Sequence, residues 1–177
     1  QYVACAGNFK DAGLEYTGAL KVLQMIFSYE YLWIQIRVKG GAYGCMCSFS
    51  DQGDSMFVTY RDPNLSESYK VYDEAADYVA DFDRDMKKYI IGTIGSMDMP
   101  MEAVDMGARS FHAYFLGKTE ADLQKVRDQV LSCTQEDIRA LAPIVKAVVE
   151  AGNRCCIGNE EKIDQNKEYF DEVKHVL

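Results

Sequence analysis

The most constraining feature of this sequence is a long apolar helical segment that ends in a double glycine. From about Thr17 to Lys39, apolar residues recur at helical spacing on nearly all sides, which predicts a helix buried on several faces. Ser28 is the position where this helix could divide in two. Gly40 and Gly41 follow, and either can adopt the left-handed conformation that ends a helix. The helix is therefore expected to stop there and the chain to turn extended.

Two polar side chains flank this double glycine. Arg37 falls in the last helical turn, and Tyr43 lies where the chain turns extended, so one rigid corner is expected to present both donors. Spacing alone favours a plainer interpretation. In that interpretation Arg37 caps the last helical carbonyl groups and Tyr43 packs at the start of a strand.

Alternation of apolar and polar residues predicts a β-hairpin directly after this corner. Residues 44–50 and 55–61 are its strands, and Asp51-Gln52-Gly53-Asp54 has the length and chemistry of the connecting loop. Short apolar runs at 2–7 and 154–158 predict two further strands. Together with the helical segments, they predict an α+β fold with a central, mostly antiparallel sheet covered by several α-helices.

The segments between the hairpin and the final strand, and the tail after that strand, are predicted to be helical. Pro143 should kink or divide the helix that follows Thr134. The two capping boxes pair Thr119 with Asp122 and Thr134 with Asp137. The chain has 177 residues, of which 48% are hydrophobic and only three are prolines, so residues 1–177 are expected to form a single domain. The expected helices cover 66–82 and 85–94, start at Asp98-Met99-Pro100, and follow Thr119 and Thr134; a polar helical tail follows the last strand.

Charge and hydropathy argue against two classes of partner. Nineteen basic and twenty-eight acidic residues give a net charge of −9, which repels nucleic acid and anionic lipid, and no basic patch offsets it. An acidic surface favours cationic peptides, although net charge commonly serves solubility alone. The longest apolar stretch, near residues 19–38, is interrupted by polar side chains, and neither a signal peptide nor a membrane span is expected.

The six cysteines indicate a reducing compartment. They form no C-x-x-C motif; Cys45 and Cys47 should share one face of a strand, and Cys155 and Cys156 lie in a short apolar run. Both pairs are expected to be small core residues. We therefore expect an intracellular, cytoplasmic protein, or one from an organelle matrix if the source is eukaryotic.

No metal site is expected within this chain. A catalytic zinc ion needs three protein ligands, yet the only histidines are His112 and His175, and neither H-x-x-E-H nor H-E-x-x-H occurs. Residues 81–92 resemble a calcium loop at their first positions, but Met86 and Gly92 replace the glycine and glutamate that such a loop requires.

Two other patterns have structural interpretations. The glycines of residues 40–44 follow a helix C-terminus, whose dipole is negative, so they do not suit phosphate binding. The tyrosines at 60, 69, 72 and 78 could form a stacking surface, but their spacing favours core packing.

The residues around the double glycine also carry a family resemblance. The sequence resembles the presequence-protease branch of the pitrilysin and insulinase superfamily of inverted-zincin metallopeptidases, over most of its length to about residue 158. The resemblance implies the last, C-terminal domain of a multi-domain protease, a fragment of a longer chain. The start at Gln1 rather than methionine suggests an excised segment or a processed chain. The matching runs are Tyr2-Val3-Ala4, residues 18–23, Glu30-Tyr31-Leu32-Trp33, residues 36–44, residues 60–65 and residues 90–94.

The resemblance implies a role for the corner. In such proteases an arginine and a tyrosine at the positions of Arg37 and Tyr43 bind the substrate carbonyl as negative charge develops on its oxygen. Gly40, Gly41 and Gly44 would shape the corner and let the substrate backbone approach. The N-terminal half of the same protease would hold the zinc ion and the general base, so this fragment alone should be inactive.

The expected function is therefore the C-terminal substrate-binding domain of a zinc-dependent metalloendopeptidase that degrades peptides. Its expected partners are the peptide substrate and the N-terminal half, with no nucleic acid and no membrane. The alternative is a non-catalytic scaffold of the same fold that pairs with an active subunit. A third interpretation is an independent peptide-binding module.

Overall fold

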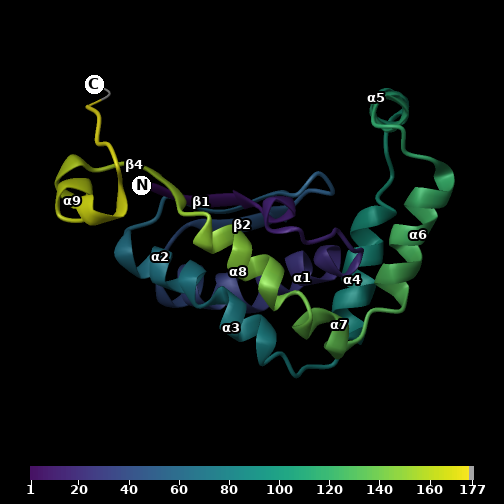
Figure 1. Cartoon of the computed structure of the whole chain (residues 1–177), viewed down its shortest axis with the longest axis horizontal. Coiled ribbons are helices and arrows are strands. Elements are labelled where there is room, and N and C mark those ends of the chain that lie inside the picture. The colour runs from purple at the N-terminus through teal and green to yellow at the C-terminus, as the bar shows by residue number, and fades with distance from the viewer. Residues whose placement is uncertain (176–177) are drawn as a thin grey trace.

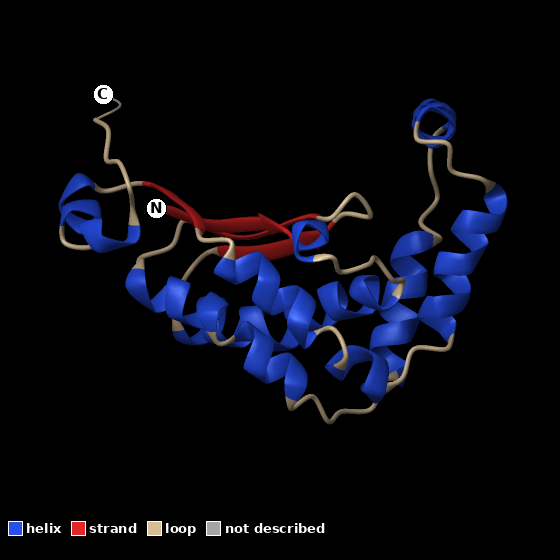
Figure 2. Cartoon of the chain, in the orientation of Figure 1, coloured by secondary structure: helices blue, strands red, loops and turns tan. Residues whose placement is uncertain are grey.

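A four-stranded antiparallel sheet organises the structure, a computed structural model that describes residues 1–175. Its strands lie in the order β2-β3-β1-β4. Figure 2 shows the main helices on one face of this sheet. The predicted α+β fold and all four predicted strands are confirmed, and no strand end differs from its prediction by more than one residue. The strands are β1 (Tyr2–Asn8), β2 (Gly44–Phe49), β3 (Asp54–Tyr60) and β4 (Asn153–Ile157).

The predicted hairpin is formed by β2 and β3. Gly44 pairs with Tyr60 at its open end, and Phe49 pairs with Ser55 beside the turn. Gly53 closes the turn with φ 99°, a value that side chains rarely permit. Phe49, Ser55 and Phe57 are buried, because alternate residues of each strand face the helices.

The helices follow the chain order shown in Figure 1. Both capping boxes are present, and Pro143 lies in the first turn of α8, so the chain divides there as predicted. The elements are η1 (Phe9–Ala12), α1 (Ala19–Ile26), η2 (Phe27–Tyr31), η3 (Trp33–Lys39), α2 (Ser66–Asp73), α3 (Ala75–Ala80), α4 (Lys87–Met97), α5 (Ala103–Phe115), α6 (Glu120–Leu131), α7 (Gln135–Arg139), α8 (Ala142–Glu150), α9 (Glu160–Asp164) and η4 (Lys167–Tyr169).

The core lies between the sheet and helices α1, α2, α3 and α8. Leu23 and Phe27 from the first helix, Phe57 from β3 and Val148 from α8 are fully buried there. Full burial of an aliphatic or aromatic side chain of this size contributes about 1.5 to 3 kcal/mol. This core fixes the helix that leads to the glycine corner against the sheet.

The long first helix departs from the prediction in two ways. Ser28 does not divide it; its hydroxyl donates to the Gln24 carbonyl oxygen at 2.8 Å, and the helix continues in π geometry through η2 and η3. The expectation of burial on several faces is also wrong for the second half, where Tyr29 is 66% exposed and Val38 62%. Strand β2 and helix α2 pack against this half, and its other side meets solvent.

Two other helix predictions need correction. The segment predicted as one helix at 66–82 forms α2 and α3, which are separated at Glu74. The helix expected from Asp98-Met99-Pro100 begins only at Ala103. That helix, α5, has no buried residue and stands apart from the main helical layer in Figure 1.

The cysteines are free thiols, and their burial differs within each expected pair. Cys5, Cys47 and Cys133 are buried, whereas Cys155 is exposed. The core prediction is therefore wrong for Cys155, because neighbouring residues of a strand face opposite sides of the sheet. Within residues 1–175, no helix combines the length and apolarity needed to cross a bilayer.

Candidate functional site

The candidate site is the corner between the π-helix η3 and strand β2. The amide of Gly40 donates to the Gln35 carbonyl oxygen at 3.0 Å, and the amide of Gly41 donates to the Arg37 carbonyl oxygen at 3.0 Å. Gly41 has φ 78° and supplies the left-handed residue, whereas Gly40 stays right-handed with φ −79°. π-helical turns of this kind often occur at functional sites.

Strand β3 and the loop after it hold this corner in place. The amide of Tyr43 donates to the carbonyl oxygens of Tyr60 at 3.1 Å and Arg61 at 3.3 Å. The side-chain amide of Asn64 donates to the Gly40 carbonyl oxygen at 2.6 Å. The buried Asp62 carboxylate accepts a hydrogen bond from the backbone amide of Asn64 at 2.9 Å. This bond restricts the loop that carries Asn64 and contacts the corner.

The structure brings Arg37 and Tyr43 together. The Arg37 guanidinium donates to the backbone carbonyl oxygen of Tyr43, and its carbon lies 5.7 Å from the centroid of the Tyr43 ring. The same guanidinium stacks over the ring of Trp33 at 4.4 Å. Arg37 is thus held between two aromatic rings by cation–π contacts.

Sequence reasoning missed a second arginine at this corner. Arg61 lies 5.7 Å from the Tyr43 ring centroid and 5.3 Å from that of Tyr60. Within residues 1–175 it is the one non-glycine residue with positive φ, at 48°. Such strain is found disproportionately at functional sites. The predicted hairpin could have indicated this neighbour. In an antiparallel hairpin, the residue that follows β3 lies beside the residue that precedes β2.

Tyr60 also belongs to this cluster rather than to the core. Its ring lies 5.4 Å from Tyr43 and 5.4 Å from Tyr2, both in edge-to-face geometry. The interpretation of the tyrosine run as core packing is therefore wrong for Tyr60, and it holds for the buried Tyr69 and Tyr72. We call the six residues Trp33, Arg37, Tyr43, Arg61, Tyr60 and Tyr2 the arginine–aromatic stack.

The stack places two permanently charged guanidinium groups beside the Tyr43 ring, each with its carbon 5.7 Å from the ring centroid. Tyr43 is 62% exposed, and its hydroxyl has no hydrogen-bond partner in the described part of the chain. The neighbouring Cys45 is no competing nucleophile, because burial raises the pKa of its thiol to about 11 despite the nearby Arg37 charge. This arrangement suits binding of a carbonyl oxygen that gains negative charge.

Gly44 contributes open space instead of an unusual conformation. A Cβ atom built at this residue would lie 4.0 Å from Tyr60 Cβ, its nearest neighbour. The corner thus leaves room beside the start of β2.

The described residues do not fit a zinc centre. No group of three histidine, cysteine, aspartate or glutamate side chains among residues 1–175 could hold a metal ion. His112 lies on α5, and the imidazole of His175 lies 3.3 Å from a Glu160 carboxylate oxygen.

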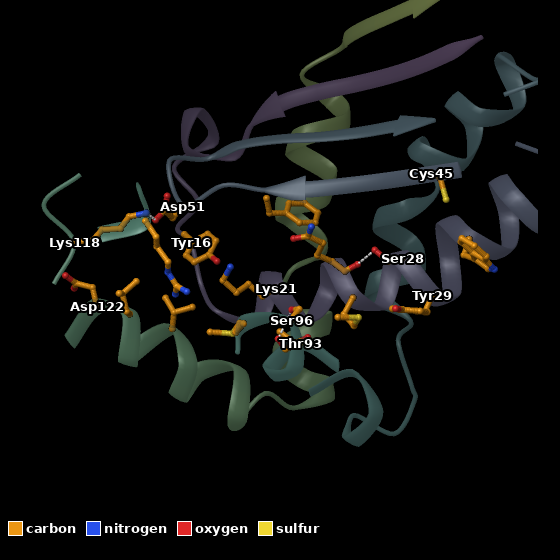
Figure 3. A pocket seen from close by; sticks show the side chains of 18 residues that line it. Tyr16, Lys21, Ser28, Tyr29, Cys45, Asp51, Thr93, Ser96, Lys118 and Asp122 are labelled. Carbon is orange, nitrogen blue, oxygen red and sulfur yellow. Dashed lines mark hydrogen bonds and ion pairs between the residues drawn. The ribbon is translucent and has the colours of Figure 1, made fainter. Parts of the chain in front are cut away.

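A groove of about 1080 Å³ begins beside the corner. Trp33, a member of the stack, is one of its lining residues. Figure 3 shows Cys45 near one end of the groove and Asp51 with Lys118 at the other. Strand β2 runs along its length, so the groove extends from the corner to the hairpin turn.

Comparison with known proteins assigns the chain to a family. Residues 1–159 match the family model of the PreP C-terminal domain. The chain is 41% identical over 180 residues to Protein HypA of Clostridium perfringens, a match that covers 100% of this chain and 18% of that protein. It is 34% identical over 183 residues to presequence protease 1, chloroplastic/mitochondrial, of Arabidopsis thaliana, covering 99% of this chain and 17% of that protein. The chain thus spans 17–18% of the length of these curated relatives.

A solved structure shares the fold. The chain aligns with a crystal structure described as that of a candidate zinc protease from Bordetella pertussis Tohama I, with a TM-score of 0.59. The alignment covers 87% of this chain and 90% of that chain at 14% sequence identity. At this identity the likeness concerns the fold alone.

Proposed function

The chain belongs to the PreP C-terminal domain family, and we propose that it is the substrate-binding domain of a zinc-dependent metalloendopeptidase that degrades peptides. Residues 1–177 form one domain of that longer protein. Its N-terminal half holds the zinc ion and the general base, and it is the partner of this chain. The fragment alone therefore has no peptidase activity.

Arg37 and Tyr43 bind the substrate carbonyl in this proposal. The observation that carries it is the convergence of both side chains at one corner, with the Tyr43 hydroxyl exposed and unpaired within the described residues. Arg37 supplies a fixed positive charge, and Tyr43 supplies a neutral hydroxyl donor. Both interactions strengthen as negative charge develops on the carbonyl oxygen, and each contributes about 3 to 4 kcal/mol, as at other oxyanion sites.

The glycines serve the approach of the substrate backbone. Gly41 makes the turn through its left-handed conformation, and Gly40 lets the helix end against the Asn64 side chain. Gly44 leaves open space beside Tyr60. These three positions therefore add no side chain between an approaching peptide and the Tyr43 hydroxyl.

The free thiols and the net charge indicate the cellular compartment of the enzyme and the kinds of partner that it lacks. Six free cysteines suit a reducing compartment, so the protein works inside the cell, in the cytoplasm or an organelle matrix. A relative is named chloroplastic/mitochondrial, which agrees with a matrix location in a eukaryote. A net charge of −9 favours neither nucleic acid nor a membrane as a partner.

The decisive experiment replaces Tyr43 by phenylalanine in the full-length protein. This change deletes one hydroxyl and keeps the ring contacts with Tyr60 and Arg61. Loss of an oxyanion donor should lower kcat about 100-fold or more and leave the melting temperature unchanged. Tyr114→Phe, which deletes an exposed hydroxyl on α5, is the matched control and should keep the parent kcat.

The opposite result would favour the scaffold alternative. If turnover of Tyr43→Phe stays within about twofold of the parent, the change in barrier is below 1 kcal/mol. Tyr43 would then be a packing residue, and the chain would be better described as a non-catalytic domain paired with an active subunit.

A further inference from the structure

The groove beside β2 runs along the free edge of the sheet. Strand β2 is the outermost strand in the order β2-β3-β1-β4, and Cys45 and Phe49 from it line the groove. Figure 3 shows Cys45 near one end, and Asp51 with Lys118 at the other. An extended peptide of six residues spans about 20 Å, so a peptide as long as β2 reaches from the corner to the hairpin turn.

The walls of the groove combine apolar and charged side chains. Met25 from α1, Phe49 from β2, and Leu123 and Val126 from α6 supply apolar surface. Peptide-binding sites commonly combine such walls with a few placed polar groups. The groove is thus suited to side chains of an extended peptide.

Two cations in the groove have no carboxylate partner. Lys118 forms an ion pair with Asp51, and the Asp122 carboxylate accepts from the Thr119 amide at 2.8 Å in the α6 capping box. No carboxylate in the described part of the chain lies within ion-pair distance of Lys21 or Arg109. An excess of unpaired positive charge in a chain of net charge −9 indicates a place for an anionic group.

The surroundings of Lys21 support this assignment. Lys21 is an exposed residue, but partial desolvation in the groove lowers the pKa of its ammonium; the Asp51 carboxylate opposes this effect, and the Arg109 and Lys118 charges add to it. A carboxylate bound beside Lys21 would stabilise the charged ammonium. The groove therefore holds a cation that gains from an anionic ligand.

We propose that this groove binds an extended peptide through a peptide carboxylate, which pairs with Lys21 and Arg109. Figure 3 places Lys21 between Cys45 and the Asp51–Lys118 pair, so the carboxylate lies within about six residues, the length of β2, of the group that contacts Tyr43. This inference rests on the proposed function. It adds to that function a preference for substrates with a carboxylate at a fixed distance from the cleaved bond.

The direct test measures peptide binding to the full-length protein in the presence of a chelator. Three fluorescent peptides share one sequence: one carries glutamate and an amidated C-terminus, one carries glutamine and an amidated C-terminus, and one carries glutamine and a free C-terminal carboxylate. At least one carboxylate peptide should bind about tenfold more tightly than the glutamine amide. Tighter binding of the glutamate amide identifies a side-chain carboxylate as the ligand, and tighter binding of the glutamine peptide with a free C-terminus identifies the chain end.

Paired substitutions connect the preference to the groove. The Lys21→Gln/Arg109→Gln protein should lose the tenfold advantage and bind all three peptides equally. Lys70→Gln/Lys146→Gln removes two exposed lysine charges from α2 and α8, outside the groove, and should retain the advantage. Three equal affinities in the parent, or an advantage that survives Lys21→Gln/Arg109→Gln, would overturn the proposal.

Kinetics separate this inference from the proposed function. Lys21→Gln/Arg109→Gln should raise KM about tenfold for the carboxylate substrate and leave kcat near the parent value. A Tyr43→Phe enzyme that retains turnover refutes the catalytic corner, whereas normal turnover with no carboxylate preference refutes the groove assignment alone.

Discussion

The guanidinium carbon of Arg37 lies 4.4 Å from the centroid of the Trp33 ring, four residues earlier in the same π-helix. Trp33 is one of the exposed large apolar residues of the helix, so its ring contributes little to the core. Its contact instead restricts the orientation of the arginine beside Tyr43. An exposed tryptophan thus positions the charge of the candidate site.

Replacing Trp33 by leucine should therefore affect turnover more than folding. Loss of an exposed cation–π contact of about 0.5 to 1 kcal/mol corresponds to a two- to fivefold decrease in kcat. Trp33→Phe retains a ring under Arg37 and should show a smaller decrease. Peptide-cleavage kinetics of both variants in the full-length protein provide the measurement, and equal decreases would contradict a stacking role.

Substitutions at Arg61 can separate its charge from its backbone strain. Arg61→Gly and Arg61→Ala both remove the second guanidinium near Tyr43, so both should lower kcat/KM for peptides by a similar factor. Glycine tolerates φ 48° better than alanine, and Arg61→Gly should be about 1 kcal/mol more stable than Arg61→Ala. Urea unfolding of this 177-residue chain tests the stability difference. Equal unfolding free energies would argue against strain at this residue.

Two glycines of the corner should respond differently to alanine. Gly41→Ala places a side chain on a residue with φ 78° and should cost about 1 kcal/mol of stability. Gly44→Ala meets no atom closer than 4.0 Å, so the fold should tolerate it. If substrate backbone approaches Gly44, this second variant should still lower kcat/KM. A Gly44→Ala enzyme with parent kinetics would remove this glycine from the proposed binding surface.

The carboxylate of Glu30 should contribute a pH-dependent share of stability. It accepts from the Lys88 ammonium at 2.6 Å and from the Tyr89 hydroxyl at 2.9 Å, and the Lys88 hydrogen bond lowers the pKa of Glu30 below 4.5. A lowered folded-state pKa gives stability that is present above pH 4.5 and is lost as the pH falls through the folded-state value.

Glu30→Gln should remove this dependence. The variant should be less stable than the parent at pH 7, and the difference should shrink as the pH falls from 5 to 3. Urea unfolding across this range is the measurement. Glu161→Gln, on α9 and outside this contact, serves as the control and should keep the parent slope. A difference between Glu30→Gln and the parent that is constant with pH would contradict the assignment.

The sequence alone determined the elements whose signals are local. Alternation in 44–61 and a glycine loop specify the β2–β3 hairpin, since its strands and turn are neighbours in the chain. Thr119 and Thr134 specify helix starts through contacts only three residues long. Arg37 and Tyr43 stand six residues apart around a double glycine, so the sequence also predicted that the two side chains meet at one corner.

Tertiary structure alone decided which residues surround that corner and which faces stay exposed. Arg61 joins Tyr43 only because β3 pairs antiparallel with β2, and Lys21 and Arg109 share a groove because distant helices flank one sheet edge. Apolar spacing marked the helix of residues 17–39 but not its exposed side, since burial depends on what packs against each face. A periodic sequence pattern specifies the conformation of a helix, whereas its neighbours depend on contacts between residues far apart in the chain.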